Sequence, residues 1–138
     1  MKRFGIKIKG IVKNADRFLL LQKWYDDRIT DPYQWEFVDG ELEYGIAPDA
    51  YVRQLVKDST GLEAIIDGIP YTWSYALGDT QIIGIAFLCH VDTDMVILSE
   101  AVSDYKWASA EELPDYIENR GILRDLERTG IIDIGGEK

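Results

Sequence analysis

The sequence has very few of the residues that build disulfide frameworks or histidine-rich metal sites. Cys89 is the one cysteine and His90 the one histidine among 138 residues, which excludes an internal disulfide and a His-rich metal centre. Basic residues are also scarce, because 15 lysines and arginines stand against 25 acidic residues and leave a net charge of −10. A chain of this charge repels nucleic-acid backbones, so we expect no nucleic-acid partner.

Long apolar runs are missing as well. No stretch approaches the roughly 20 apolar residues of a membrane-spanning helix, so we expect no membrane partner. The start of the chain, Met1 to Phe4, lacks the apolar segment of a secretory signal, and these absences together predict a cytoplasmic protein. The composition, 46% hydrophobic and 29% charged, is that of a globular domain with one core. We expect one domain over residues 1–130 and a C-terminal tail over residues 131–138.

Hydrophobic periodicity predicts a hairpin at the start of the chain. Residues 4–12 alternate between apolar and polar side chains, as in a strand with one wet face, and Lys7 and Lys9 fall on that face. A turn over residues 13–17 separates this strand from a second, more buried strand at 18–22. Residues 24–34 read as a long loop, and a bend is expected at Asp39 and Gly40.

The segment from Pro48 to Thr60 is the best-marked helix. Its apolar residues recur at helical spacing, Pro48 suits a first turn, and Gly61 suits the position after the last turn. Further strands are expected at residues 35–37, 63–66, 71–77, 81–91 and 106–108, with a final helix over 115–128 interrupted by Gly121. The strand at 81–91 is almost wholly apolar, so it is predicted to be central. This order predicts an α/β fold, a mixed sheet sandwiched between helices.

The segment from Trp35 to Leu62 contains the most informative motif. It reads W-E-F-V-D-G-E-L-E-Y-G-I-A-P-D-A-Y-V-R-Q-L-V-K-D-S-T-G-L. This string resembles the signature of the Nudix (MutT-like) superfamily, G-x5-E-x7-R-E-U-x-E-E-x-G-U, where U is a bulky aliphatic residue. Gly40 begins the signature and Gly61 ends it at the right separation. The hairpin before the motif, the strand after it and the stretch from Ser103 to Leu113 also resemble family counterparts, so the likeness extends over nearly the whole chain.

The resemblance implies a Nudix fold and a hydrolase that acts on nucleoside diphosphates linked to another moiety. In that family, glutamates on the signature helix hold a divalent metal, Mg²⁺ or Mn²⁺, that bridges a diphosphate. Aligned without gaps, these acidic positions fall mostly on uncharged residues. The first Glu falls on Ile46, the Arg-Glu pair on Gln54 and Leu55, and the Glu-Glu pair on Asp58 and Ser59. The signature is therefore degenerate, and Asp58 is the one helical carboxylate near the metal position.

A shifted alignment is the alternative, and it places Arg53 on the signature arginine. It needs a deletion and an insertion within one helix, each of which would rotate the side chains by about 100 degrees. The ungapped alignment keeps the apolar stripe of the helix facing the sheet, so we favour it. Asp58 is the remaining helical carboxylate in both alignments.

Four acidic residues are candidate catalytic groups. They are Asp58, which is also the candidate metal ligand, the loop acids Glu41 and Glu43, and Asp104 in a later loop. Each has a simpler reading as a solvated surface acid or a turn residue, and Asp39, grouped with the loop acids, shares that reading. Glu36 either faces the cleft or lies on the wet face of its strand.

The candidate substrate-binding residues are cationic or aromatic. They are Arg28, Tyr33, Arg53 and Tyr75. Arg53 could contact a phosphate or lie on a solvated helix face. Tyr71, Trp73 and Tyr75 share one face of a strand, where they could stack on a flat ring, pack on the sheet or meet a second copy of the chain. Cys89 reads as a buried free thiol, and neither it nor His90 has an obvious Asp or Ser partner for nucleophilic catalysis.

Two functions follow for the chain. By resemblance it is a metal-dependent hydrolase, but the missing box carboxylates predict that classical hydrolysis is weak or lost, so its status as an enzyme stays open. The alternative is a Nudix-fold protein without catalysis that binds a nucleotide-like small molecule or acts as a homodimeric interaction module.

Overall fold

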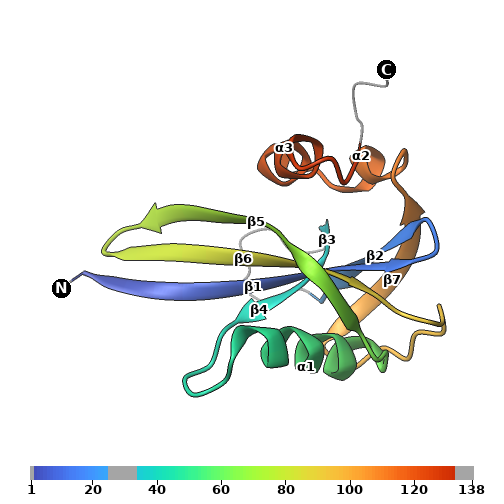
Figure 1. Cartoon of the computed structure of the whole chain (residues 1–138), viewed down its shortest axis with the longest axis horizontal. Helices are drawn as coiled ribbons and strands as arrows, with labels where there is room; N and C mark the ends of the chain where they lie inside the picture. Colours follow the sequence, from blue (N-terminus) through green and yellow to red (C-terminus); the bar gives the residue numbers. More distant parts are fainter. Residues whose placement is uncertain (1, 25–33, 133–138) are drawn as a thin grey trace.

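The computed structural model describes residues 2–24 and 34–132. A seven-stranded mixed sheet lies between α1 on one face and α2 and α3 on the other, which confirms the expected α/β architecture (Figure 1). Among the described residues, no helix is both long and apolar enough to cross a bilayer. The elements are β1 Arg3–Asn14, β2 Arg17–Lys23, β3 Trp35–Glu36, β4 Val38–Glu41, α1 Pro48–Thr60, β5 Ile65–Leu77, β6 Thr80–His90, β7 Val102–Ser109, α2 Leu113–Tyr116 and α3 Arg120–Arg128.

β1 is the strand around which the sheet is organised. It pairs in parallel with β6 along its whole length, and antiparallel with both β2 and β4. Its side chains alternate between two covered faces: Ile8 and Val12 pack on the α1 side, and Ile11 packs on the side of α2 and α3. The expectation of one wet face is therefore wrong. Lys9, assigned to that face, is only 7% exposed.

α1 begins and ends where the local sequence signals place it. Pro48 occupies the first turn, and Gly61 closes the helix with φ of +77°, its N–H donating to the carbonyl of Lys57. The predicted stripe is also confirmed, because Tyr51, Val52 and Val56 are buried against the sheet.

Three boundaries differ from the sequence expectations. The bend expected at Asp39 and Gly40 is strand β4, because these residues pair with Lys9 and Ile8 of β1. The two strands expected at 63–66 and 71–77 form one strand, β5, with bulges between Ile66 and Tyr71. The final helix breaks before residue 120 and not at Gly121.

The break between α2 and α3 has a local cause in a side-chain cap. The side-chain oxygen of Asn119 accepts hydrogen bonds from the N–H groups of Gly121 and Ile122, at 2.9 and 3.2 Å. This cap starts α3 after an extended residue, so Gly121 lies inside the first turn. Beyond α3, Ile132 is buried in the core cluster on the α2 and α3 side.

The two faces of the sheet have separate cores. On the α1 side the buried residues include Leu19, Leu21, Leu62 and Phe87, and on the opposite side they include Phe18, Leu20, Phe37 and Leu126. Both cores therefore depend on side chains of β2 that alternate across the sheet.

Trp73 of β5 packs so closely on β6 that the opposing residue must be glycine. A Cβ added to Gly84 would lie 2.2 Å from the ring of Trp73, whereas one added to Gly68 would have nothing within 4 Å. We expect Gly84→Ala to displace the ring and lower the free energy of unfolding by about 1–3 kcal/mol. Gly68→Ala is the matched control in the same sheet and should cost less. Urea denaturation of both variants measures the difference, and equal stabilities would contradict this packing.

Candidate functional site

The signature segment of the sequence forms β4, a loop and α1. Gly40 lies in β4 against α1, and a Cβ added there would lie 2.8 Å from Cδ2 of Leu55. Leu55, which the ungapped alignment places on a signature glutamate, is partly buried against the α1-side core. Its side chain therefore contributes apolar packing between α1 and β4.

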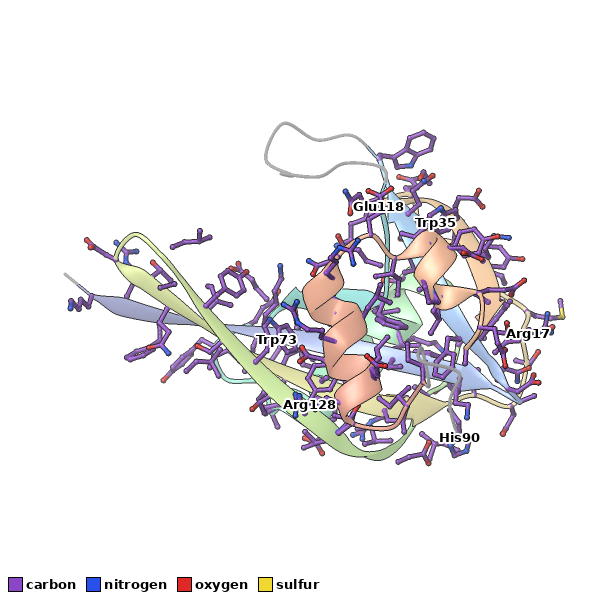
Figure 2. All side chains as sticks on the ribbon, turned by 90° about the horizontal axis from the view of Figure 1, so that it is seen from above. Arg17, Trp35, Trp73, His90, Glu118 and Arg128 are labelled. Atoms are coloured by element: carbon purple, nitrogen blue, oxygen red, sulfur yellow. The ribbon has the colours of Figure 1, made fainter. Side chains whose placement is uncertain are left out.

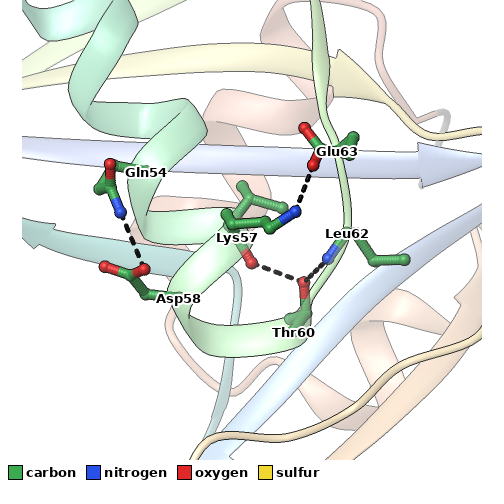
Figure 3. Close-up of polar contacts among 7 residues, drawn as sticks. Gln54, Lys57, Asp58, Thr60, Leu62 and Glu63 are labelled. Carbon is green, nitrogen blue, oxygen red and sulfur yellow. Dashed lines mark hydrogen bonds and ion pairs between the residues drawn. The ribbon is translucent and has the colours of Figure 1, made fainter.

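Asp58 lies on the exposed face of α1, one turn after Gln54. The Gln54 amide nitrogen donates a 2.8 Å hydrogen bond to the Asp58 carboxylate, as Figure 3 shows. The next residue back, Lys57, forms an ion pair with Glu63 beyond the end of the helix. In the ungapped alignment the Glu-Glu pair of the signature thus falls on Asp58, which is hydrogen-bonded to Gln54, and on Ser59.

Glu41 and Glu43 lie together, but not with Asp58. Both line a shallow pocket of about 460 Å³ against the start of β1, whose lining also contains Tyr44 and Ile46. Burial raises the pKa of the nearby Tyr51 hydroxyl, and the charges of Glu43 and Glu41 raise it further. Ile46, at the position of the first signature glutamate, adds an apolar side chain to this pocket.

The other predicted site residues lie on separate elements. Asp104 is exposed on β7, where its carboxylate accepts a 2.8 Å hydrogen bond from the backbone N–H of Tyr105. Arg53 is exposed on α1, and Tyr75 is exposed near the far end of β5. Arg28 and Tyr33 lie outside the described residues.

The described side chains do not fit a family-type magnesium site. Mg²⁺ prefers several oxygen ligands in a near-octahedral arrangement, held by carboxylates. Within residues 2–24 and 34–132, no three or more His, Cys, Asp or Glu side chains gather closely enough to hold a metal ion. On α1, Asp58 is the carboxylate at the signature position, and it already accepts a hydrogen bond from Gln54.

A charged cluster that the sequence did not predict lies where β2, β3 and β4 meet β1. The ammonium of Lys23 lies 2.8 Å from the carboxylate of Asp39, whose side chain is only 11% exposed. Glu36 contacts Asp39 through a side-chain hydrogen bond. Asp39 therefore is not part of a solvated acidic loop, and Glu36 does not lie on a wet face. We name Lys9, Lys23, Glu36 and Asp39 the polar cluster.

Lys9 connects the polar cluster to the aromatic residues of β5. Its ammonium lies 4.5 Å from the centre of the Trp73 ring and 5.9 Å from that of Tyr71. The guanidinium of Arg128 lies 6.0 Å from the centre of the same Tyr71 ring. Figure 2 shows Trp73 and Arg128 where α3 passes over the sheet. Of the three aromatics predicted to share a face, Tyr71 and Trp73 thus pack inside, and Tyr75 is 41% exposed.

The protonation of the polar cluster follows from its burial. Burial raises the pKa of Glu36 to about 7, aided by the charge and hydrogen bond of Asp39. Burial would also raise the pKa of Asp39, but the ammonium of Lys23 lowers it below its usual range. Burial lowers the pKa of Lys9, and the carboxylate of Asp39 opposes that shift. The cluster therefore holds one firm ion pair and one carboxyl group that changes its charge near neutral pH.

The sequence around Lys9 did not indicate this cluster. Lys9 alternates with apolar residues as Lys7 does, a pattern that predicts a wet face and not a buried lysine that needs a nearby acid. Its cross-strand partner, however, is Asp39, and 30 residues separate them in the chain. The sequence contains no local signal for that pairing.

Cys89 and His90 lie near the end of β6. Cys89 is fully buried, as predicted, and burial raises the pKa of its thiol to about 11, with a further contribution from Asp67. His90 does have an acidic partner, because its Nδ1 lies 2.9 Å from the Asp67 carboxylate on β5. The sequence did not indicate this acidic partner, since strand pairing joins residues 23 positions apart.

Glu36 should make the stability of the protein depend on pH near neutrality. Between pH 4.5 and about 7 the folded state binds more protons than the unfolded state, so the stability that protonated Glu36 contributes is lost as the pH rises. We expect Glu36→Gln to gain melting temperature relative to the wild-type protein across this window. Glu41→Gln, which removes an exposed carboxylate from β4, is the control. If the melting temperatures of Glu36→Gln and the wild-type protein differ by the same amount at every pH, the assignment is refuted.

Comparison with known proteins gives a consistent likeness. No family model matches the chain. The nucleoside triphosphatases NudI of Escherichia coli (strain SE11) and Shigella flexneri are each 27% identical over 133 residues, which cover 88% of this chain and 94% of each relative. A MutT protein from Methanosarcina mazei Go1 matches with a TM-score of 0.80 at 23% identity, over 94% of this chain and 95% of that one.

Two further solved structures extend this likeness. An Ap4A hydrolase from C. elegans has a TM-score of 0.75 at 17% identity, over 96% of this chain and 99% of that one. A NUDIX hydrolase from Nitrosomonas europaea has a TM-score of 0.76 at 14% identity, over 99% of this chain and 76% of that one. The chain therefore has the Nudix fold, and the resemblance of its sequence to Nudix hydrolases is confirmed.

Proposed function

We propose that the chain binds a nucleotide-like small molecule containing linked phosphates, and that its classical metal-dependent hydrolysis is weak or absent. The names of its relatives, a nucleoside triphosphatase and an Ap4A hydrolase, support the ligand class. By resemblance, the reaction, where it persists, is hydrolysis of a nucleoside diphosphate linked to another moiety.

The observation that carries the proposal is the chemistry of α1. Water attack on a diphosphate needs a metal that neutralises the developing charge, and Mg²⁺ in turn needs several carboxylates held in place. At the signature positions α1 offers Leu55, which packs on Gly40, and Asp58, which accepts a hydrogen bond from Gln54. One shared carboxylate provides too few ligands for strong binding.

The polar cluster supports a binding role. The ammonium of Lys23 is half-exposed, so it can contact an anionic or hydrogen-bonding group while it keeps its ion pair with Asp39. Protonated Glu36 can donate a hydrogen bond and ionised Glu36 can only accept one. Near neutral pH this carboxyl group can therefore bind either an acceptor or a donor group of a ligand. Trp73 adds a ring beside Lys9.

The remaining candidates keep the roles that the sequence assigned to them. We propose Arg53, exposed on α1, as a phosphate contact and Tyr75 as a ring contact. If the protein has residual turnover, Asp58 is the proposed ligand of Mg²⁺ or Mn²⁺, with Glu41, Glu43 and Asp104 as the acids that could assist. We also propose a cytoplasmic protein that forms homodimers.

Restoring the signature should create hydrolysis that the wild-type protein lacks. We expect Leu55→Glu combined with Asp58→Glu and Ser59→Glu to raise kcat/KM at least about tenfold, which corresponds to ~1.4 kcal/mol of transition-state stabilisation. Phosphate release, coupled to a phosphatase, is measured on nucleoside triphosphates and nucleoside diphosphate derivatives with Mg²⁺ and then Mn²⁺. The control combines Leu55→Gln with the same two substitutions, because glutamine loses the packing on Gly40 without adding a carboxylate.

The wild-type protein is the baseline of the same assay. Its turnover should stay close to that of a metal-free control, and Asp58→Ala should leave it unchanged. Vigorous metal-dependent turnover by the wild-type protein, abolished by Asp58→Ala, would overturn the proposal that hydrolysis is weak.

Ligand binding should be visible without turnover. A nucleoside diphosphate derivative at about 100 times its Kd should stabilise the fold by about 2.7 kcal/mol and raise the melting temperature. We expect Lys23→Met to weaken this response, because it removes the half-exposed cation of the polar cluster. Lys57→Met is the matched control, since its ion pair with Glu63 lies at the far end of α1. If none of the derivatives shifts the melting temperature of the folded protein, the binding proposal fails.

A further inference from the structure

The outer edge of β5 is open in the part of the chain that the structure describes. The order of strands in the sheet ends with β5, which pairs with β6 on one side. Figure 1 shows that the β5–β6 hairpin projects beyond the helices on both faces of the sheet. An edge strand presents unpaired backbone N–H and C=O groups, which can pair with a further strand.

The hairpin register shows which residues present these groups. Leu77 pairs with Thr80 across the two-residue turn Gly78–Asp79, and a pair that flanks such a turn exchanges both of its hydrogen bonds. Because the pattern alternates along the strand, Tyr71, Trp73 and Tyr75 also direct their backbone groups toward β6. The residues between them, Thr72, Ser74 and Ala76, direct theirs outward.

Beyond the bulges and Pro70, the part of this edge from Tyr71 to Gly78 lacks the usual protection against strand addition. Natural edge strands place charged residues, lysine above all, where another strand would approach. From Gly68 to Gly78 the chain contains no charged residue, although 29% of the whole sequence is charged. Several large apolar side chains of the strand are exposed instead: Ile69 by 56%, Tyr75 by 41% and Leu77 by 66%.

We propose that a second copy of the chain adds to this edge, with the two β5 strands antiparallel and Ser74 on the two-fold axis. In this register Ser74 pairs with Ser74 of the partner subunit, and Thr72 pairs with Ala76 of the partner subunit. Thr72, Ser74 and Ala76, the residues whose backbone groups point outward, would therefore all be hydrogen-bonded. The sheets of the two copies become one continuous sheet.

The side chains fit the same register. Trp73 lies opposite Tyr75 of the partner subunit in a non-hydrogen-bonded pair, the geometry in which cross-strand side chains approach most closely. Leu77 lies opposite Tyr71 of the partner subunit, so its exposed side chain gains an aromatic neighbour. Aromatic pairs of this kind stabilise antiparallel strands beyond the hydrogen bonds themselves.

Charge favours a second copy at this edge over other surfaces of the chain. Each copy has a net charge of −10, so most orientations bring acidic surfaces together. The stretch from Gly68 to Gly78 contains no charged side chain, so two copies can meet there without repulsion between like charges. This dimer gives a register to the homodimer proposed above, and it assigns Tyr75 to a contact with the second copy instead of a ligand ring. It does not depend on ligand binding or on hydrolysis, so its failure can be told apart from failure of either.

Sedimentation and light scattering over a range of micromolar concentrations test the dimer. One strand buries little surface, so we expect a concentration-dependent dimer in the wild-type protein. Ser74→Lys should weaken association at least about tenfold, because two ammonium groups would meet at the axis. Gln81→Lys is the matched control: it also breaks the Gln81–Ser74 hydrogen bond and adds the same charge, but on the inner strand β6. A wild-type protein that stays monomeric, or equal loss in both variants, overturns the proposal.

Cross-linking tests the register. Directly opposed residues of a hydrogen-bonded pair have Cα atoms about 5.5 Å apart, which suits a disulfide. Ser74→Cys should therefore form a covalent dimer under mild oxidation, whereas Thr72→Cys, also exposed but away from the axis, should not. The wild-type protein, in which Cys89 is buried, is the background. Cross-linking of Thr72→Cys as efficient as that of Ser74→Cys, or of neither variant, would overturn the register.

Discussion

The burial of β1 on both faces is the constraint on which the rest of the structure depends. This strand pairs with β2, β4 and β6, and helices cover it from both sides. A lysine in its middle cannot reach bulk water easily, so an acid must lie close to it. Asp39 of β4 meets that need, and the ring of Trp73 lies beside the same ammonium. The polar cluster is thus needed to stabilise the buried Lys9 in the fold, whether or not it also binds a ligand.

The contact between α1 and β4 is built by apolar packing. Gly40 lets the helix approach β4, and the side chain that fills the gap is Leu55. An apolar side chain there stabilises the contact between helix and sheet, since it is partly buried with the α1-side core. In the ungapped alignment, this same side chain stands where the signature has a glutamate. Stability of the helix and capacity for metal binding are therefore opposed at this position.

The sequence predicted those features that depend on neighbours in the chain. α1 was predictable with both ends because Pro48, Gly61 and the apolar stripe are local signals. The Nudix fold was predictable because the motif around Gly40 resembles a family signature. The pairing of Asp39 with Lys9 and of Asp67 with His90 was not, because strand register decides both. The break before α3 was placed at Gly121, because glycine weakens a helix. The Asn119 cap instead sets the start of α3, so Gly121 lies inside its first turn.

Cys89 shows what its place on β6 means for chemical reactivity. A thiol reacts with oxidants and alkylating agents as its thiolate, and with a pKa of about 11 only about one molecule in 10⁴ is ionised at pH 7. The sulfur is also fully buried among the apolar side chains of the α1-side core. The thiol of Cys89 is therefore protected from oxidants and alkylating agents in the folded protein, and its modification reports how readily the sheet opens.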